Sequence, residues 1–226
     1  FVSILEACRA FPKTKLIYAS SSSVYGLNKK TPFAVEDKTD QPANLYGATK
    51  KANEVMAHAY HHLYGLSVTA LRYFTVYGPW GRPDMAYYRF TRQICEGEPI
   101  NVFNHGLMKR DFTYIDDIVA GTIAAIDLGA ACEIFNLGNH CPISLIYLIQ
   151  LLEEGLQKKA VRNMLPMQPG EVTETYADIE KSQRMLRFRP AVSLEEGILK
   201  FLQWYRSYHG VKSQKSDKSF LVQESI

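Results

Sequence analysis

The chain has 226 residues, 46% of them hydrophobic and 12% aromatic, which is enough to bury a sizeable core in one or two domains. Its formal net charge of +3 is spread along the sequence, which argues against a nucleic-acid partner and suits a small anionic ligand. No apolar run reaches membrane-spanning length, and the four cysteines show no close pairing. We therefore expect no membrane segment, no structural metal and a reducing, cytoplasmic location. Because the chain begins at Phe1 without a methionine, a targeting or membrane segment upstream stays open.

Helices and strands alternate in the first part of the chain. Apolar spacing predicts an amphipathic helix over residues 1–11 and another over 45–63, which lacks proline and is rich in good helix formers. Runs of apolar, β-branched and aromatic residues predict strands over 15–19 and 66–74, and two prolines mark the stretch 26–44 as a loop. This alternation predicts an α/β fold with a parallel sheet.

A stretch dense in turn formers, residues 77–84, marks a change of character. We place a boundary there, between a sheet domain over 1–78 and a smaller α/β lobe over 79–210. Beyond it the sequence predicts, in order, a helix over 85–96, strands over 99–103 and 109–115, a helix opening at Asp116 and Asp117, a strand over 133–138, a helix from Ser144 to about 157, an extended segment over 172–177, and helices over 179–186 and 193–208. The polar tail, 211–226, is predicted to be disordered.

Tyr46 and Lys50 form the pair on which the functional prediction depends. They are four residues apart in a predicted helix and therefore share one face. A lysine ammonium beside a phenol favours the phenolate, so Tyr46 can act as a general base near neutral pH. Taken alone the pair is weak, because a surface lysine above an interfacial tyrosine has the same spacing. The spacing recurs at Tyr25 and Lys29, but Gly26 disfavours a helix there, so we do not expect that copy to be catalytic.

Four consecutive serines, Ser20–Ser23, follow the first predicted strand. By composition alone such a cluster is an ordinary polar loop. In an open parallel sheet, however, ligands bind outside the carboxyl ends of the strands, where this cluster lies. The serines therefore strengthen the prediction of a site that includes Tyr46 and Lys50.

Longer stretches carry a resemblance to a known family. They are Tyr18–Gly26, Tyr46–Lys50, Leu71–Ala86, Arg110–Asp117 and Pro169–Glu171. With them the chain resembles, from residue 1 to about 210, the extended short-chain dehydrogenase/reductases that act as nucleotide-sugar epimerases and dehydratases. The resemblance implies an incomplete Rossmann-type parallel sheet domain followed by a smaller C-terminal α/β substrate lobe. It is strongest to the members that convert UDP-glucuronate to UDP-galacturonate.

The family opens with a glycine-rich dinucleotide fingerprint on its first strand, and this sequence contains none. At about 30 residues per strand–helix–strand unit, the missing portion would amount to roughly 100 residues. We therefore expect the chain to be a C-terminal fragment without the adenosine and pyrophosphate half of the NAD site. Such a fragment would bind NAD weakly or not at all on its own.

By resemblance, the reaction is epimerisation at C-4 of a UDP-sugar through a transient 4-keto intermediate, with NAD as the cofactor. Tyr46 would take the proton from the sugar 4-hydroxyl, Lys50 would hold the nicotinamide ribose, and Ser21 would hydrogen-bond the reacting oxygen. The expected cofactor contacts are Ser20, Tyr46, Lys50, Tyr73 and Phe74.

The resemblance also implies how the sugar is held. Dehydratases of the family carry an acid pair after the position of Ser21, because eliminating water needs a proton donor and a base. Here Ser22 and Ser23 stand there, and hydroxyls can instead donate hydrogen bonds to a carboxylate. Together with Thr75, and with Arg82 nearby, the serines would form a cradle for the glucuronate carboxylate.

Three further residues would bind the nucleotide. Arg110 would bind the UDP diphosphate, because a guanidinium matches phosphate in a bidentate manner. Phe103 would stack on uracil, and Glu171 would accept hydrogen bonds from the uridine ribose. Without the resemblance, Arg110 would be read as a surface arginine and Thr75 as a plain strand-end threonine.

The resemblance implies a homodimer, in which the helices over 1–11 and 45–63 pair with their two-fold mates in a four-helix interface. Alternative functions stay open. Among enzymes they are UDP-glucose 4-epimerase and a dehydrating or decarboxylating nucleotide-sugar relative. The non-enzyme alternative is a catalytically silent NAD-fold binding module, which the loss of Tyr46 or Lys50 would favour, and both are present.

Overall fold

The structure, a computed structural model, describes residues 1–11, 13–168 and 171–211. Its first part is a three-stranded parallel sheet in the order β1 (Lys15–Ser21), β2 (Ser67–Tyr73) and β6 (Cys132–Leu137). The register of β1 on β2 places Ser20 beside Arg72 and Ser21 beside Tyr73. The predicted α/β architecture with a parallel sheet is confirmed.

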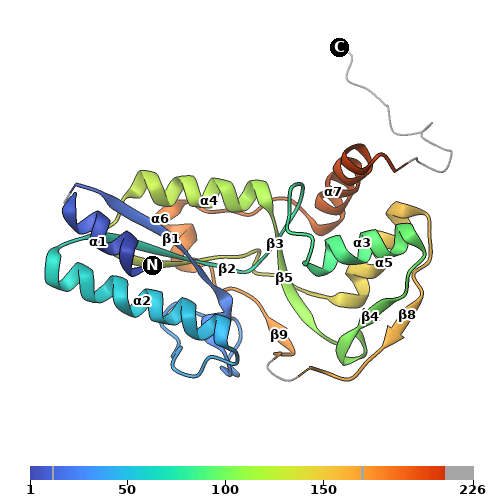
Figure 1. Ribbon diagram of the computed structural model, residues 1–226, viewed down its shortest axis with the longest axis horizontal. Coiled ribbons are helices and arrows are strands. Elements are labelled where there is room, and N and C mark those ends of the chain that lie inside the picture. Colours follow the sequence, from blue (N-terminus) through green and yellow to red (C-terminus); the bar gives the residue numbers. More distant parts are fainter. Residues whose placement is uncertain (12, 169–170, 212–226) are drawn as a thin grey trace, which may run out of the picture.

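Helices cover both faces of this sheet (Figure 1). On one face lie α1 (Val2–Ala10) and α2 (Leu45–Tyr64), whose Leu5 and Ala57 pack with Leu66 and Val68 in one core. On the other face lie α4 (Ile115–Leu128) and α6 (Glu180–Leu186), which share a second core with the apolar side chains of β2 and β6. The sheet is therefore held between two apolar layers, the arrangement of doubly wound α/β folds.

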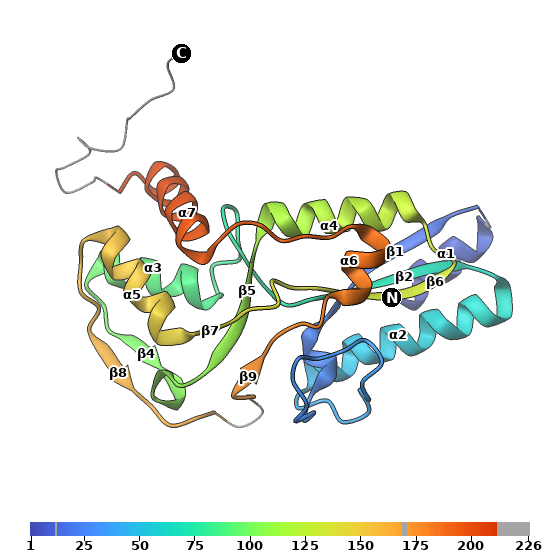
Figure 2. The same ribbon diagram turned by 180° about the vertical axis from the view of Figure 1, so that it is seen from behind.

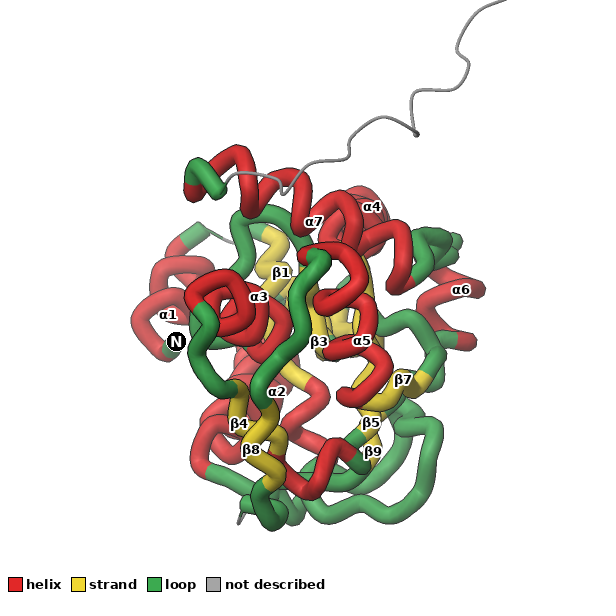
Figure 3. The backbone as a smooth tube through the Cα atoms, turned by 90° about the vertical axis from the view of Figure 1, so that its right-hand side faces the viewer, coloured by secondary structure: helices red, strands yellow, loops and turns green. Residues whose placement is uncertain are grey.

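The chain leaves this sheet through β3 (Thr75–Tyr77) and builds a second lobe (Figure 2). There β3, β5 (Lys109–Tyr114), β7 (Pro142–Ser144) and β9 (Glu174–Thr175) form a four-stranded mixed sheet, and β4 (Ile100–Val102) pairs with β8 (Arg162–Met164). The helices of this lobe are α3 (Ala86–Glu96), α5 (Leu145–Leu156) and α7 (Leu194–His209), and they enclose an aromatic-rich core. Figure 3, viewed from the end of the lobe, shows α3 and α5 side by side above the β4–β8 pair.

The chain passes between the two lobes more than once, and the boundary near residue 78 stays a prediction. β6 pairs with β2 in the first sheet, and α4 and α6 pack on that sheet. Because β2 and β6 are parallel neighbours, a long crossover connection must join them, and this connection includes the first half of the second lobe. The first lobe is therefore assembled from residues on both sides of the predicted boundary.

Most of the elements lie where the sequence predicts them. The Ser144 hydroxyl oxygen accepts the N–H of Tyr147 at 3.2 Å and caps α5. The strands β3, β7 and β8 are not predicted from the sequence. Each has three residues, which is too short for an alternation of apolar and polar side chains to be recognised. The predicted tail lies outside the described residues from 212 onward, as do residues 169 and 170 of one motif. In the described part of the chain, no helix is both long and apolar enough to cross a membrane.

Candidate active site

The helix α2 begins against the serine run because of its capping residue and a glycine. The side chain of Asn44 accepts the backbone N–H of Gly47 at 2.9 Å, which fixes the first turn. A methyl group on Gly47 would lie 2.5 Å from the carbonyl oxygen of Ser23, so only glycine allows the helix to approach this closely. The first turn of α2 thus rests on the 3₁₀ turn η1 (Ser22–Tyr25) and brings Tyr46 to the end of β1.

Tyr46 and Lys50 lie on one side of α2, next to the first sheet. Lys50 Nζ donates a hydrogen bond to the carbonyl oxygen of Ala19 at 3.0 Å and lies 5.7 Å from the centre of the Tyr46 ring. Tyr46 is 51% exposed, so its phenol is open to a ligand. The two side chains thus share one face of α2 at the end of β1.

The serines at the end of β1 have different partners. The Ser21 hydroxyl oxygen accepts the N–H of Ser23 at 3.1 Å, and its hydroxyl donates to Ser23 Oγ at 3.2 Å. Ser20 is buried, and its hydroxyl donates to the carboxylate of Glu54 at 2.7 Å. The Ser20 side chain is therefore engaged inside the protein, whereas the hydroxyls of Ser22 and Ser23 belong to the cavity walls described next.

A cavity of about 530 Å³, which we call the catalytic cavity, opens between the two lobes at this point. Its volume lies in the range of small-molecule sites. The predicted site residues that line it are Ser20, Ser21, Ser22, Ser23, Tyr46, Tyr73, Phe74, Thr75 and Arg82. Arg82 is exposed and pairs with Asp84 at 3.1 Å. The general-base candidate and the predicted carboxylate cradle therefore share one cavity.

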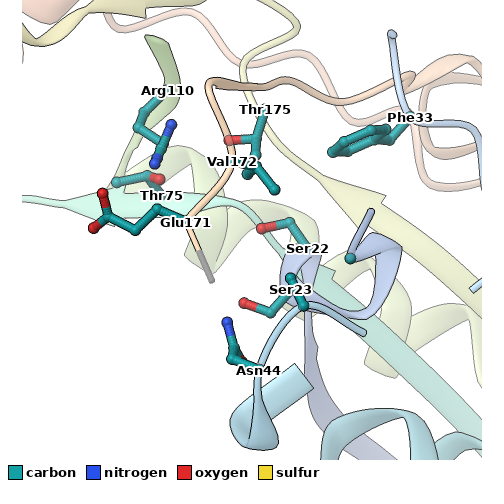
Figure 4. Close-up of a pocket in the computed structure, with 11 residues that line it drawn as sticks. Ser22, Ser23, Phe33, Asn44, Thr75, Arg110, Glu171, Val172 and Thr175 are labelled. Atoms are coloured by element: carbon teal, nitrogen blue, oxygen red, sulfur yellow. The ribbon is translucent and has the colours of Figure 1, made fainter. Parts of the chain in front are cut away.

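Two further cavities of about 210 Å³ adjoin the catalytic cavity. The polar cavity is lined by polar side chains from two sides: Ser22, Ser23 and Asn44 on one, and Thr75, Arg110 and Glu171 on the other (Figure 4). The apolar cavity is lined by Thr75, Met85, Tyr87, Phe103, Met108, Arg110, Phe112 and Glu171 among others. Thr75, the first residue of β3, lines all three cavities, so they meet at its side chain.

Arg110 supplies positive charge where the polar and apolar cavities join. Its guanidinium donates to the carbonyl oxygen of Lys109 at 2.9 Å and lies 3.4 Å from Met108 Sδ, and both neighbours are uncharged. Burial lowers the pKa of Arg110, and the nearby Glu171 carboxylate acts in the opposite direction. Among the described residues, Glu171 Oε2 is shielded from solvent and has no hydrogen-bond partner. A half-buried guanidinium near a carboxylate oxygen with free acceptor capacity suits a ligand that carries both an anion and hydroxyl groups.

The second tyrosine–lysine pair differs from the first in the burial of its tyrosine. Tyr25 is buried, and its hydroxyl donates to Asn136 and accepts from Arg72, so it cannot serve an external ligand. The sequence reasoning missed Asn44, which sits in the polar cavity wall and whose position before a helix is a recognisable capping signal. It also missed Met85 and Tyr87 in the apolar cavity, which no spacing pattern distinguishes from ordinary core residues.

Comparison with known proteins gives consistent results. The model of the NAD dependent epimerase/dehydratase family matches residues 1–138. UDP-glucuronate 4-epimerase 4 of Arabidopsis thaliana is 50% identical over 227 aligned residues, which cover 92% of this chain and 52% of that protein. The crystal structure of UDP-glucuronic acid 4-epimerase from Bacillus cereus, in complex with UDP-glucuronic acid and NAD, has a TM-score of 0.84 and 39% sequence identity to this chain. The match covers 91% of this chain and 65% of the Bacillus cereus chain.

A more distant structure is similar in fold. UDP-glucose 4-epimerase from Thermotoga maritima, with UDP-glucose, is 29% identical with a TM-score of 0.83, covering 92% of this chain and 68% of its own. The chain thus spans about half the length of the curated plant relative and about two thirds of these solved structures.

Proposed function

The chain belongs to the NAD dependent epimerase/dehydratase family, and from that premise we propose that the whole protein epimerises a UDP-sugar at C-4. By the whole protein we mean residues 1–226 with any sequence that precedes or follows them. UDP-glucuronate, converted to UDP-galacturonate, is the substrate best supported by the relatives. The observation that carries the proposal is the meeting of three cavities at Thr75, between the Tyr46–Lys50 pair and Arg110.

The residues around the catalytic cavity fit the reactive end of NAD. Lys50 is held on the Ala19 carbonyl with donor capacity left for a ribose hydroxyl, because an ammonium has three N–H groups. Tyr73 and Phe74 offer ring surface in the same cavity. When bound, the cofactor would supply the hydride chemistry of the reaction, as acceptor and then as donor. Tyr46, Lys50, Tyr73 and Phe74 would hold it there, with Ser20 contributing to the wall.

The chain's own residues supply the proton chemistry. Tyr46, with Lys50 beside its ring, acts as the general base that takes the proton of the sugar 4-hydroxyl and later returns it. Ser21, at the end of β1, would turn its hydroxyl from Ser23 Oγ to the reacting oxygen and so stabilise the charge that develops on it. After the 4-keto sugar turns over in the cavity, the same residues serve the opposite face, so no second base is required.

The substrate assignment rests on the hydroxyl groups that face the cavities. Ser22, Ser23 and Thr75 present donors to a sugar carboxylate, and Arg82 adds a nearby cation. No acid pair follows Ser21, which disfavours the dehydratase alternative. On the nucleotide side, Arg110 would bind the diphosphate, Phe103 would stack on uracil and Glu171 would accept from the ribose hydroxyls.

The test is a product assay on the whole protein with NAD present. UDP-glucuronate and UDP-glucose are supplied separately, and the products are identified by NMR of the sugar C-4 proton. We expect UDP-galacturonate from the first and little reaction with the second. Efficient conversion of UDP-glucose to UDP-galactose would instead support the UDP-glucose 4-epimerase alternative. No turnover of either sugar, with NAD bound, would support the silent binding module.

We further propose that the whole protein is a homodimer through α1 and α2. Both helices carry exposed large apolar side chains: Val2, Ile4, Leu45, Val55, Leu63 and Tyr64. Such a surface on two adjacent helices suits a symmetric four-helix contact. Sedimentation velocity at micromolar concentration should show a dimer, and the double charge substitution Val55→Glu with Leu63→Lys should yield the monomer.

The compartment we propose is the cytoplasm. All four cysteines of the chain are free thiols, and Cys141 is exposed. Free thiols of this kind persist in reducing compartments.

A further inference from the structure

A carboxylate that takes no part in the proposed chemistry lies buried behind the site. The side chains of Glu54, on α2, and Arg72, on β2, are each 2% exposed. Arg72 donates through Nε to Glu54 Oε1 and through Nη2 to Oε2, both at 2.8 Å. Ser20 donates to the same Oε1 at 2.7 Å. Burial acts to raise the pKa of Glu54, but the hydrogen bonds and charge of Arg72 outweigh it, so the pKa lies below its ordinary value.

The position of this ion pair ties it to the predicted catalytic residues. Glu54 is one helical turn beyond Lys50, which is itself one turn beyond Tyr46. On β1, the carbonyl of Ala19 accepts from Lys50 and the hydroxyl of Ser20 donates to Glu54, immediately before Ser21. Arg72 lies directly beside Ser20 in the register of β1 and β2. The Glu54 carboxylate thus links α2 to β1 and β2, one helical turn away from Lys50.

Arg72 is anchored on its other side as well. Its Nη1 donates to the Tyr25 hydroxyl at 2.9 Å and to the carbonyl oxygen of Val35 at 3.1 Å. The Tyr25 hydroxyl in turn donates to Asn136 of β6 at 2.7 Å. With its donors occupied by fixed partners, the guanidinium cannot swing with the helix. It therefore acts as a fixed point of the sheet for Glu54.

Among the buried residues of α2, Glu54 alone reaches a charged partner on the sheet. The residues of α2 that are buried in the structure are Gly47, Glu54 and Ala57, and two of these are small. A bidentate ion pair has one geometry, which the packing of a small side chain such as Ala57 does not impose. Buried ion pairs contribute little net stability compared with apolar residues of similar size, so fixing a geometry is the stronger reason for one here.

We propose that Glu54 and Arg72 are positioning residues, which set the rotation of α2 so that Tyr46 faces Ser21 across the catalytic cavity and Lys50 keeps its hydrogen bond to Ala19. The inference rests on the proposed function for its activity readout, and on the fold alone for its structural readout. A displacement of about 1 Å in a catalytic group can lower turnover about 100-fold. Loss of the pair should therefore act on kcat far more than on KM, because the substrate contacts of Arg110 and the apolar cavity stay intact.

The first test compares Glu54→Gln with a matched control in the whole protein. Glu153 is also a buried glutamate, 3% exposed, and pairs with Arg162 at 2.8 Å, but it lies in the second lobe away from the cavities. Both Glu54→Gln and Glu153→Gln should lower the melting temperature. Only Glu54→Gln should reduce kcat, by about 10- to 100-fold, with KM changed less than about threefold. Equal kcat values in the two variants would overturn the positioning role.

The second test separates catalysis from folding and does not depend on the first variant being stable. The double variant Glu54→Leu with Arg72→Met removes both charges and refills the space with apolar atoms, which often restores stability. We expect wild-type melting temperature but reduced kcat. We also expect faster amide hydrogen exchange over residues 46–50, which Glu153→Gln should leave unchanged. Recovery of both kcat and protection would refute the proposal. If the wild type epimerises no UDP-sugar, the proposed function fails, and the exchange measurement still decides whether the pair positions α2.

Discussion

The α-carbon of Gly47 faces the carbonyl oxygen of Ser23 so closely that a methyl group there would lie 2.5 Å from that oxygen. The contact joins the first turn of α2 to the turn that follows β1. Tyr46 precedes this glycine and Ser21 precedes the serine by two residues, so the contact sets the separation of the two. Any side chain at residue 47 would push Tyr46 away from Ser21.

The first prediction is that Gly47→Ala lowers activity by at least about tenfold, because the backbone oxygen of Ser23 cannot move aside as a side chain can. Stability should fall by about 1–3 kcal/mol, as in other overpacked sites. Steady-state kinetics and thermal unfolding measure the two effects. Gly155→Ala is the control, since its methyl group would meet the flexible side chain of Leu202 far from the cavities. Comparable loss of activity in both variants would contradict this account.

The second prediction concerns Tyr46 itself. Tyr46→Phe in the whole protein removes the proposed base and should reduce kcat by about 100-fold or more, the usual scale of general base catalysis. Tyr64→Phe makes the same chemical change at the other end of α2, in a tyrosine that is also 51% exposed. That control should keep wild-type kcat. Near-normal turnover by Tyr46→Phe would remove the proposed mechanism.

The third prediction tests the carboxylate cradle. Thr75→Val keeps the shape of the side chain but removes its hydroxyl at the junction of the three cavities. Since a hydrogen bond to a charged group contributes about 1.5–3 kcal/mol, kcat/KM for UDP-glucuronate should fall about 10- to 150-fold. Residual UDP-glucose turnover, which involves no carboxylate, should change much less. Equal losses with the two sugars would mean that Thr75 does not recognise the carboxylate.

The fourth prediction concerns pH and Asp111, a buried residue of β5. Burial raises the pKa of Asp111 to about 6, although the N–H groups of Ala177, Asn139 and His140 bond its carboxylate and act in the opposite direction. Between the ordinary value of 3.8 and about 6, the folded protein therefore holds this proton more tightly than the unfolded chain. The contribution of Asp111 to the free energy of unfolding should fall as pH rises through this window and stay level above it.

Thermal unfolding of the wild type and of Asp111→Asn, measured from pH 4 to pH 8, checks this sign. One pH unit corresponds to about 1.4 kcal/mol, so the difference between the two proteins should change by about 3 kcal/mol, mostly below pH 6. Asp127→Asn, on the exposed surface of α4, is the control for loss of one negative charge. A difference that does not vary with pH would show that Asp111 keeps its charge throughout.

Local periodicity and turn chemistry predicted much of this fold, and the long-range pairings escaped prediction. The spacing of Tyr46 and Lys50 placed them on one helix face, and the serine run marked the end of β1. Their partnership with Arg110 and Glu171 came from the family resemblance rather than from any pattern within the chain. Glu54 and Arg72 carry no periodic signal, since an ion pair across 18 residues depends on how a helix docks on a sheet. The return of the chain to the first sheet at β6 is of the same kind, because strand order depends on tertiary packing.

The strand β1 lies at the border of the described sheet, paired with β2 on one side only. Its seven residues, Lys15–Ser21, therefore offer a row of backbone N–H and C=O groups along the other edge, and such a row is a template for another strand. Purified as residues 1–226 alone, the chain should tend to self-associate along this edge, whereas a strand supplied in parallel register would keep the copies apart. β1 ends in Ser20 and Ser21, which line the catalytic cavity, so a strand paired with β1 would also hold that wall of the cavity in place. The same strand pairing would therefore improve both the solubility of the chain and the order of the site.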